Sequence, residues 1–241
     1  LVPTLVSGLC HEPDFGVFCI STCITFFAGL IGFLCGLKAD QRVGEREGYL
    51  IVALVWFLFS LFGMLPFYLS GAVDSVTDAF FETMAGFTTT GATVLPDVEA
   101  MTHGILLWRA LSQWLGGLGI IVLCVAILPM FGLGGMQLYA AEVTGVSYEK
   151  LSPRIADTAK RMWMMYFILT GLEVLLLWLE GMDIFDSVCH SLSTIATGGF
   201  STKNLSLMNY SPMIQYTVAV FMLLSGINFA LLILVFMRKP Q

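Results

Sequence analysis

The sequence predicts an all-α integral membrane protein in which an N-terminal helix hairpin precedes two helix–loop–helix repeats. Its 241 residues are 57 % hydrophobic and 12 % charged, with a mean hydropathy of +0.86, whereas soluble domains carry about a quarter charged residues. Five apolar stretches reach the roughly 20 residues that cross a bilayer. Two Gly/Thr-rich loops occupy matching places between them, and their glycines Gly91 and Gly199 are 199 − 91 = 108 residues apart.

The apolar stretches set the expected order of elements. Residues 1–9 are expected to be the end of a further span, because the chain starts inside an apolar run without Met, and we expect the chain to be a fragment. The second repeat contains one insertion, since inner-helix glycines Gly117 and Gly226 are 226 − 117 = 109 residues apart. The predicted spans are 15–37, 49–70, 104–128, 162–181 and 213–237.

Each Gly/Thr loop follows an apolar segment that is too short to cross a membrane. Ser75-x-x-Asp78 and Asp183-x-x-Asp186 provide acid-rich start signals for two such half-helices. At about 10–12 residues, these segments are typical of re-entrant helices. Irregular backbone at membrane depth must be buried in protein or line a water-filled cavity, so we expect both loops to face such a cavity.

Basic residues are strongly biased to one side of the predicted spans. Only Lys203 lies in the loops of the other side. The positive-inside rule therefore predicts that the basic loops are cytoplasmic and that both Gly/Thr loops face outward, where acidic side chains would concentrate cations. The nine residues on the basic side are Lys38, Arg42, Arg46, Lys150, Arg154, Lys160, Arg161, Arg238 and Lys239.

The composition of the two loops suits a cation filter. A pore that passes a dehydrated cation must replace the water shell with oxygens, and successive backbone carbonyls do this when they point inward. Glycine suits the positive φ angles of such a strand, and threonine adds a hydroxyl acceptor. Two matched loops predict a potassium-channel-like helix–pore loop–helix unit used twice. The candidate filter residues are Thr89, Thr90, Gly91, Thr197, Gly198 and Gly199.

These features divide the chain into four expected parts. They are an N-terminal helix hairpin with a cytoplasmic loop (1–48), a first helix–pore loop–helix repeat (49–137), a cytoplasmic connection (138–161) and a second repeat (162–241).

Several longer motifs resemble a known family. They are Asp78-Ala79-Phe80-Phe81-Glu82, TTTGATVL at 88–95, QWLGGLGIIVL at 113–123, AILPMFGLGGMQLY at 126–139, PRIADTAK at 153–160 and ATGGFST at 196–202. On these residues the chain resembles the TrkH type within the Trk/Ktr/HKT superfamily of potassium transporters, over nearly its whole length.

The resemblance implies potassium uptake, by symport or channel-like flow, through the bacterial inner membrane. It implies a four-repeat pore with one filter loop and one filter glycine per repeat. It also implies a homodimer of complete subunits, a cytoplasmic nucleotide-binding regulator of the TrkA type, no cofactor, no enzymatic activity and no nucleic-acid partner. This chain carries two of the four repeats, so it lacks the interrupted third inner helix and the arginine of the fourth.

Other functions remain open on the sequence alone. A sodium-permeable relative is one alternative, although Gly91 favours potassium because a serine accompanies sodium preference in that superfamily. A non-conducting assembly subunit is another. An intramembrane hydrolase is disfavoured, because Ser225 and His190 are the only candidate residues and no supporting motif accompanies them.

Three further polar residues require an interpretation. Glu173 lies inside a predicted span, where an acid is either functional or a protonated structural group that faces another helix. Arg109 is expected to extend to the membrane interface rather than to support the filter from behind. His190 corresponds to Glu82 at the 108-residue offset and is expected to pack rather than to bind metal.

Overall fold

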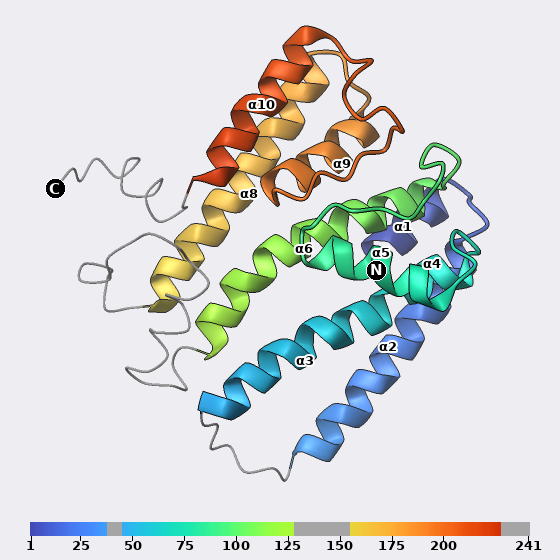
Figure 1. Ribbon diagram of the computed structural model, residues 1–241, viewed down its shortest axis with the longest axis vertical. Helices are drawn as coiled ribbons and strands as arrows, with labels where there is room; N and C mark the ends of the chain where they lie inside the picture. The colour runs from blue at the N-terminus through green and yellow to red at the C-terminus, as the bar shows by residue number, and fades with distance from the viewer. Residues whose placement is uncertain (38–44, 128–154, 228–241) are drawn as a thin grey trace, which may run out of the picture.

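The structure is a computed structural model that describes residues 1–37, 45–127 and 155–227. Within these ranges it consists of α-helices without strands (Figure 1), as the sequence predicts. The helices are α1 (Val2–Leu9), α2 (Phe15–Gly36), α3 (Glu45–Gly63), α4 (Leu65–Leu69), α5 (Val76–Phe87), α6 (His103–Ile127), α8 (Ile155–Leu179), α9 (Ile184–Ile195) and α10 (Pro212–Gly226).

The N-terminal hairpin consists of α1 and α2, and α1 also packs against α6. The turn between the two helices supplies Glu12, whose carboxylate accepts hydrogen bonds from the backbone N–H groups of His103 (2.8 Å) and Gly104 (3.0 Å). These groups are among the orphan donors at the start of α6. The hairpin is therefore fixed to the first repeat through a helix cap.

Each repeat places a short helix between two longer ones (Figure 1). Helix α5 contacts α3 and α6, and helix α9 contacts α8 and α10. Helix α6 also packs on α9 and so joins the two repeats. A buried cluster at this junction contains Leu118, Tyr166, Leu169, Ile195 and Phe221, contributed by α6, α8, α9 and α10.

Three helical segments in the described part of the chain are long and apolar enough to cross a membrane: Phe15–Gly36, Leu50–Leu69 and Lys160–Leu179. They coincide with three predicted spans, and α6 coincides with the predicted span at 104–128. Helix α10 begins the predicted span at 213–237 but ends at Gly226, after which Ile227 is extended. The remainder of that span lies outside the described residues, and α8 begins within the predicted cytoplasmic connection.

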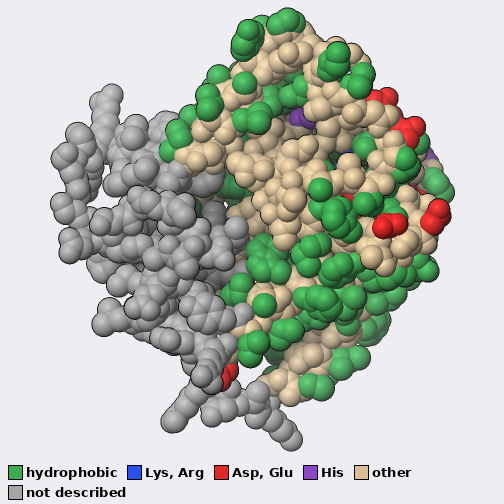
Figure 2. Space-filling view, in the orientation of Figure 1, with side chains coloured by type: hydrophobic (Ala, Val, Ile, Leu, Met, Phe, Trp, Pro, Cys, Tyr) green, Lys and Arg blue, Asp and Glu red, His purple; other side chains and the backbone are tan. Residues whose placement is uncertain are grey.

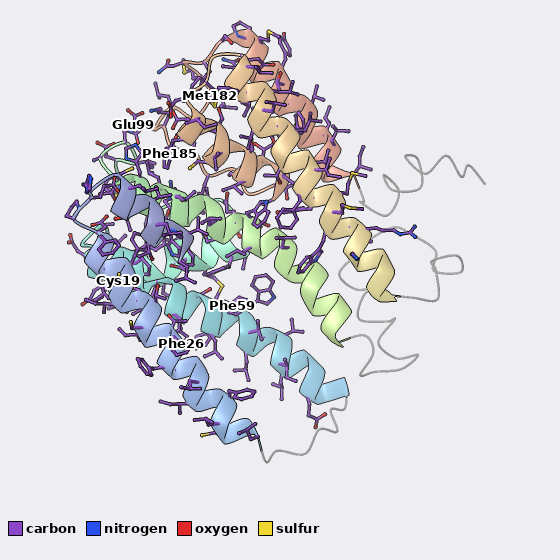
Figure 3. All side chains as sticks on the ribbon, turned by 180° about the vertical axis from the view of Figure 1, so that it is seen from behind. Cys19, Phe26, Phe59, Glu99, Met182 and Phe185 are labelled. Atoms are coloured by element: carbon purple, nitrogen blue, oxygen red, sulfur yellow. The ribbon has the colours of Figure 1, made fainter. Side chains whose placement is uncertain are left out.

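The sides of the long helices expose large apolar side chains, as expected for surfaces that face lipid. Figure 3 shows Phe26 on α2 and Phe59 on α3, which are 65 % and 50 % exposed. Green side chains cover much of the face in Figure 2, while most of the acidic side chains in view lie near one edge. The chain is a multi-pass membrane protein. Most of the basic loops lie outside the described residues, so the predicted orientation stays a prediction.

Candidate functional site

The half-helices α5 and α9 match each other residue for residue. Each has 12 residues, and their first residues are 184 − 76 = 108 positions apart. The Ser75 hydroxyl accepts a long hydrogen bond from the backbone N–H of Asp78 (3.5 Å), and the Asp183 carboxylate accepts one from Phe185 (2.9 Å). Both predicted start signals are therefore N-caps.

The backbone leaves the two half-helices in the same way. In each loop, consecutive N–H groups bond back to carbonyls in the last turn of the preceding half-helix, at positions that correspond by the same offset of 108. The bonds are Thr89 N to Gly86 O (2.9 Å), Thr90 N to Ala85 O (3.0 Å), Thr197 N to Thr194 O (2.9 Å) and Gly198 N to Ser193 O (2.9 Å). The two loops therefore share one backbone path.

The same two positions of each loop adopt positive φ angles. They are Thr89 (53°) and Gly91 (74°) in the first loop, and Thr197 (55°) and Gly199 (83°) in the second. Glycine accepts this conformation at little cost, but a β-branched residue there is an outlier. Such strain costs about 1–3 kcal/mol per residue and persists where the surroundings impose it, often at functional sites. The sequence indicates the glycines but gives no sign of the two strained threonines.

The two loops are in direct contact. A Cβ placed on Gly91 would lie 2.0 Å from the carbonyl oxygen of Gly198. No side chain fits at that distance, so this contact requires glycine as strictly as the positive φ does. The structure thus brings together the two candidate loops that the sequence separates by more than a hundred residues.

Glycines of helix α6 allow it to approach the ends of both half-helices. A Cβ on Gly116 would lie 2.1 Å from the carbonyl oxygen of Phe87, and one on Gly117 would lie 3.3 Å from Cα of Ala196. Phe87 is the last residue of α5, and Ala196 follows α9. The small residues of this helix therefore serve close packing behind the loops.

Arg109 of α6 braces the loops from behind, and the expectation that it extends to the membrane interface is wrong. Its side chain is 2 % exposed, and its Nε donates to the Glu82 carboxylate of α5 at 2.8 Å. The other guanidinium nitrogens donate to the Thr93 hydroxyl (3.3 Å) and to the Ser201 carbonyl (3.1 Å). The guanidinium also lies 4.2 Å from the ring centroid of Phe200. One buried cation thus contacts both repeats.

Glu82 completes this brace on the first repeat. Its carboxylate is fully buried, and it accepts hydrogen bonds from the Thr93 hydroxyl (2.9 Å) and the Val94 backbone N–H (2.9 Å) in addition to Arg109. A buried charge is tolerated only when it is paired and hydrogen-bonded, and both conditions hold here. The strand that follows the first loop is therefore tied to α5 and α6 together.

His190 supports the second loop at the position equivalent to Glu82. One ring nitrogen lies 2.8 Å from the Asp186 carbonyl oxygen, and the other lies 3.0 Å from the Ser201 hydroxyl. Ser201 corresponds to Thr93, since 201 − 93 = 108. In the same repeat, the Asp186 carboxylate accepts hydrogen bonds from Thr202 (2.6 Å) and Tyr210 (2.7 Å). The second repeat thus uses a neutral contact where the first uses an ion pair.

The loops that precede α6 and α10 are joined through Asn204. Its side-chain oxygen accepts from the Val98 backbone N–H (2.8 Å), and its amide donates to the Asp97 carboxylate (2.7 Å). The Asn204 backbone N–H donates to Glu99 (3.0 Å). Hydrogen bonding by Asn204 holds the pKa of Asp97 below its usual value. Figure 3 shows Glu99 at the same end of the molecule as Phe185 of α9, which packs against the loop of the first repeat.

Glu173 lies in α8 and faces the interior of the helix bundle. It is fully buried. Acids inside membrane spans almost always face the bundle interior in this way. A functional role and a structural role of Glu173 both stay predictions.

Comparisons with known proteins identify a family model and relatives that match most of this chain. Residues 17–240 match the family model described as TrkH, cation transport protein. The Trk system potassium uptake protein TrkH of Escherichia coli K12 is 49 % identical over 214 residues, which are 86 % of this chain and 44 % of that protein. Protein TrkG of the same strain is 36 % identical over 99 % of this chain.

A solved structure also resembles the whole chain. The crystal structure of the potassium transporter TrkH from Vibrio parahaemolyticus has a TM-score of 0.82 and 38 % identity, covering 99 % of this chain and 48 % of that one. The chain spans about half the length of the curated relatives it matches.

Proposed function

Because the chain belongs to the TrkH family of cation transport proteins, we propose that it forms two of the filter segments of a potassium uptake pore. The filter residues in this proposal are Thr89, Thr90 and Gly91 of the first loop, and Thr197, Gly198 and Gly199 of the second. The carbonyls of these residues replace the water shell of a potassium ion as it passes. The named relatives are potassium uptake proteins, and the proposal extends that substrate to this chain.

The single observation that carries the proposal is the repeated backbone strain. Thr89 and Thr197 adopt positive φ at equivalent positions, two residues after the last residue of their half-helices. A β-branched residue in this region would relax if nothing opposed it. Two independent occurrences, each followed two positions later by a glycine with positive φ, support a shared function that depends on backbone shape rather than on side-chain chemistry.

The proposal includes the rest of the pore and its setting. The two filter segments join two further ones in a complete four-repeat pore in the bacterial inner membrane. The chain then divides as the sequence predicts, into a hairpin part, two repeats and a connection. A Cβ on Gly199 would have no atom of the described residues within 4 Å, which leaves room for a neighbouring repeat. Dimerisation and a cytoplasmic TrkA-like regulator complete the assembly.

Substitution at Gly91 tests the proposal. Gly91→Ser places a side chain at a positive φ and against the Gly198 carbonyl, so we expect it to disturb the filter contact. Strain of about 1 kcal/mol or more approaches the 1.4 kcal/mol of a tenfold preference. We therefore expect the rubidium-to-sodium uptake ratio of the complete protein to fall by about tenfold in a strain without potassium uptake systems.

Ala92→Ser is the matched control. Ala92 lies one residue beyond the glycine and outside the positive-φ positions, so the same added hydroxyl should leave the ratio near its wild-type value. A wild-type ratio for Gly91→Ser would remove this loop from the filter. A complete protein that takes up sodium as readily as rubidium would replace the potassium proposal by the sodium-permeable one.

A further inference from the structure

A fully buried glutamine, Gln113, lies between the two candidate filter loops. It belongs to α6 of the first repeat, and its side chain has no exposed surface. Its Oε1 atom accepts hydrogen bonds from the Ser193 hydroxyl at 2.5 Å and from the Phe200 backbone N–H at 3.1 Å. These donors lie before and after the second loop in the sequence, so one amide oxygen holds both ends of that loop.

The same side chain occupies the space beside the loop glycines. A Cβ on Gly198 would lie 2.3 Å from the Gln113 side-chain carbon, and one on Gly91 would lie 3.7 Å from Nε2. Gly198 corresponds to Thr90 of the first loop, since 198 − 90 = 108. The side chain present at position 90 is therefore excluded at position 198, because Gln113 fills its place.

The orientation of the amide follows from its partners. The Phe200 N–H only donates, so the atom that faces it must be the acceptor oxygen. The Nε2 group is then directed to the other side, toward the contact of Gly91 with Gly198, and it has no hydrogen-bond partner among the described residues. The amide thus holds the second loop with its oxygen and lies against the first loop with its nitrogen.

We propose that Gln113 is a positioning residue that sets the separation of the two filter loops and thereby the preference of the pore among alkali cations. It touches the loop backbones rather than the ion path, so it acts through the positions of Gly198 and Phe200. This inference rests on the proposed function and deepens it. It also assigns to the first repeat a direct role in shaping the filter segment of the second.

The test measures the ratio of rubidium to sodium uptake by the complete protein. Gln113→Met keeps the length of the side chain but removes the acceptor, so the second loop loses both hydrogen bonds. We expect the ratio to fall by about five- to tenfold, because each of the two lost neutral hydrogen bonds corresponds to about a two- to threefold change. A merely structural role would lower the amount of protein in the membrane and the uptake of both ions by one common factor, which leaves the ratio unchanged.

Two further variants keep the test decisive. Ser193→Ala removes one of the two donors and changes little volume, so we expect a smaller fall of about twofold to fivefold. Should Gln113→Met fail to reach the membrane, the Ser193→Ala ratio decides. Gln215→Met is the matched control, because that glutamine lies in the first turn of α10 and donates to the Leu207, Met208 and Tyr210 carbonyls, away from both loops. Its ratio should remain that of the wild type.

The outcomes separate this inference from the function on which it rests. If Gly91→Ser lowers the ratio while Gln113→Met and Ser193→Ala leave it unchanged, the positioning role is wrong and the filter remains. If Gly91→Ser also leaves it unchanged, the loops are not a filter and both proposals fail. A lowered ratio in all three variants, with a wild-type ratio in Gln215→Met, supports the inference.

Discussion

The two repeats share a backbone but differ in the side chains that hold it. The half-helices, their caps and the two positive-φ positions coincide at one offset. Behind the loops, the first repeat has the Glu82–Arg109 ion pair, whereas the second has the neutral His190–Ser201 contact. In both, the side chain at this position of the half-helix contacts the hydroxyl residue two positions past the positive-φ glycine of the loop. The comparison indicates that each loop must be bonded to its half-helix, whereas the bond can be either an ion pair or a neutral hydrogen bond.

The repeats also differ in how far their inner helices reach. Helix α6 contacts both loops, since Arg109 and Gln113 each bond to residues after the second loop. The hydrogen bond that Ser225 of α10 makes to Thr194 stays within its own repeat. The described part of the molecule is therefore asymmetric, because the second loop depends on the first repeat more than the reverse.

Removing the charge of Glu82 should have the largest effect on stability. Glu82→Gln leaves the buried Arg109 cation without its ionic partner, so we expect the free energy of unfolding to fall by about 3–5 kcal/mol. His190→Gln, at the equivalent position, breaks only neutral contacts, and we expect a loss of about 1–2 kcal/mol. Denaturant unfolding of the purified complete protein in detergent measures both.

A double variant sharpens this comparison. Glu82→Leu combined with Arg109→Met removes both charges, and apolar replacements of buried pairs are often neutral or stabilising. We therefore expect it to recover most of the loss seen in Glu82→Gln. Equal losses of unfolding free energy for Glu82→Gln and His190→Gln would contradict the distinction between a buried ion pair and a neutral contact.

Gly198 and Thr90 provide a second test at equivalent positions. Gly198→Ala adds a Cβ that would lie 2.3 Å from the Gln113 side chain, so we expect overpacking to cost about 1–3 kcal/mol. Thr90→Ala only loses a hydroxyl contact with Thr88, and we expect a loss of about 1 kcal/mol or less. Unfolding in detergent measures both, and a larger loss for Thr90→Ala would show that Gln113 yields to the added methyl.

The starts of the inner helices should respond differently to acid. Helix α10 is capped by its own Ser211, but α6 is capped by Glu12 of the hairpin. Partial burial works to raise the pKa of Glu12, yet hydrogen bonds from the Gly104 and His103 backbones outweigh it and hold the pKa below the usual 4.5. The stabilisation is thus complete above pH 4.5 and is lost as the pH falls through the lower folded-state pKa.

Hydrogen exchange measures this smallest effect. Protection factors of the first amides of α6 should decrease from pH 6 to pH 3, while those of α10 should stay constant. Glu12→Gln should abolish the pH dependence at α6. An equal decrease in both helices would show that acid loosens this whole end of the molecule rather than one cap.

Much of the fold was predictable from the sequence, because its signals are local. Ser75 and Asp183 mark the starts of the half-helices, and apolar length marks the spans. The side chains that pair only in the folded structure were harder to predict. Arg109 lies near the start of a predicted span, which favours the membrane interface, whereas its ionic partner Glu82 lies 27 residues away in the sequence. The sequence does offer one signal of this pairing, because an acid and a base each lie in an apolar segment and the two segments are neighbours along the chain. Gln113 gave none, since its partners lie 80 and 87 residues along the chain.

The one-residue difference between the repeats identifies a place where chain length can vary. Thr93 and Ser201 correspond at an offset of 108, but α6 and α10 begin at 212 − 103 = 109, so the extra residue lies between Ser201 and Pro212. This segment contains exposed turn residues and Ser206 at a positive φ. A short epitope tag inserted after Met208 would therefore extend a surface turn and leave the backbone of the two loops in place, which offers a way to determine the side of the membrane on which this face lies.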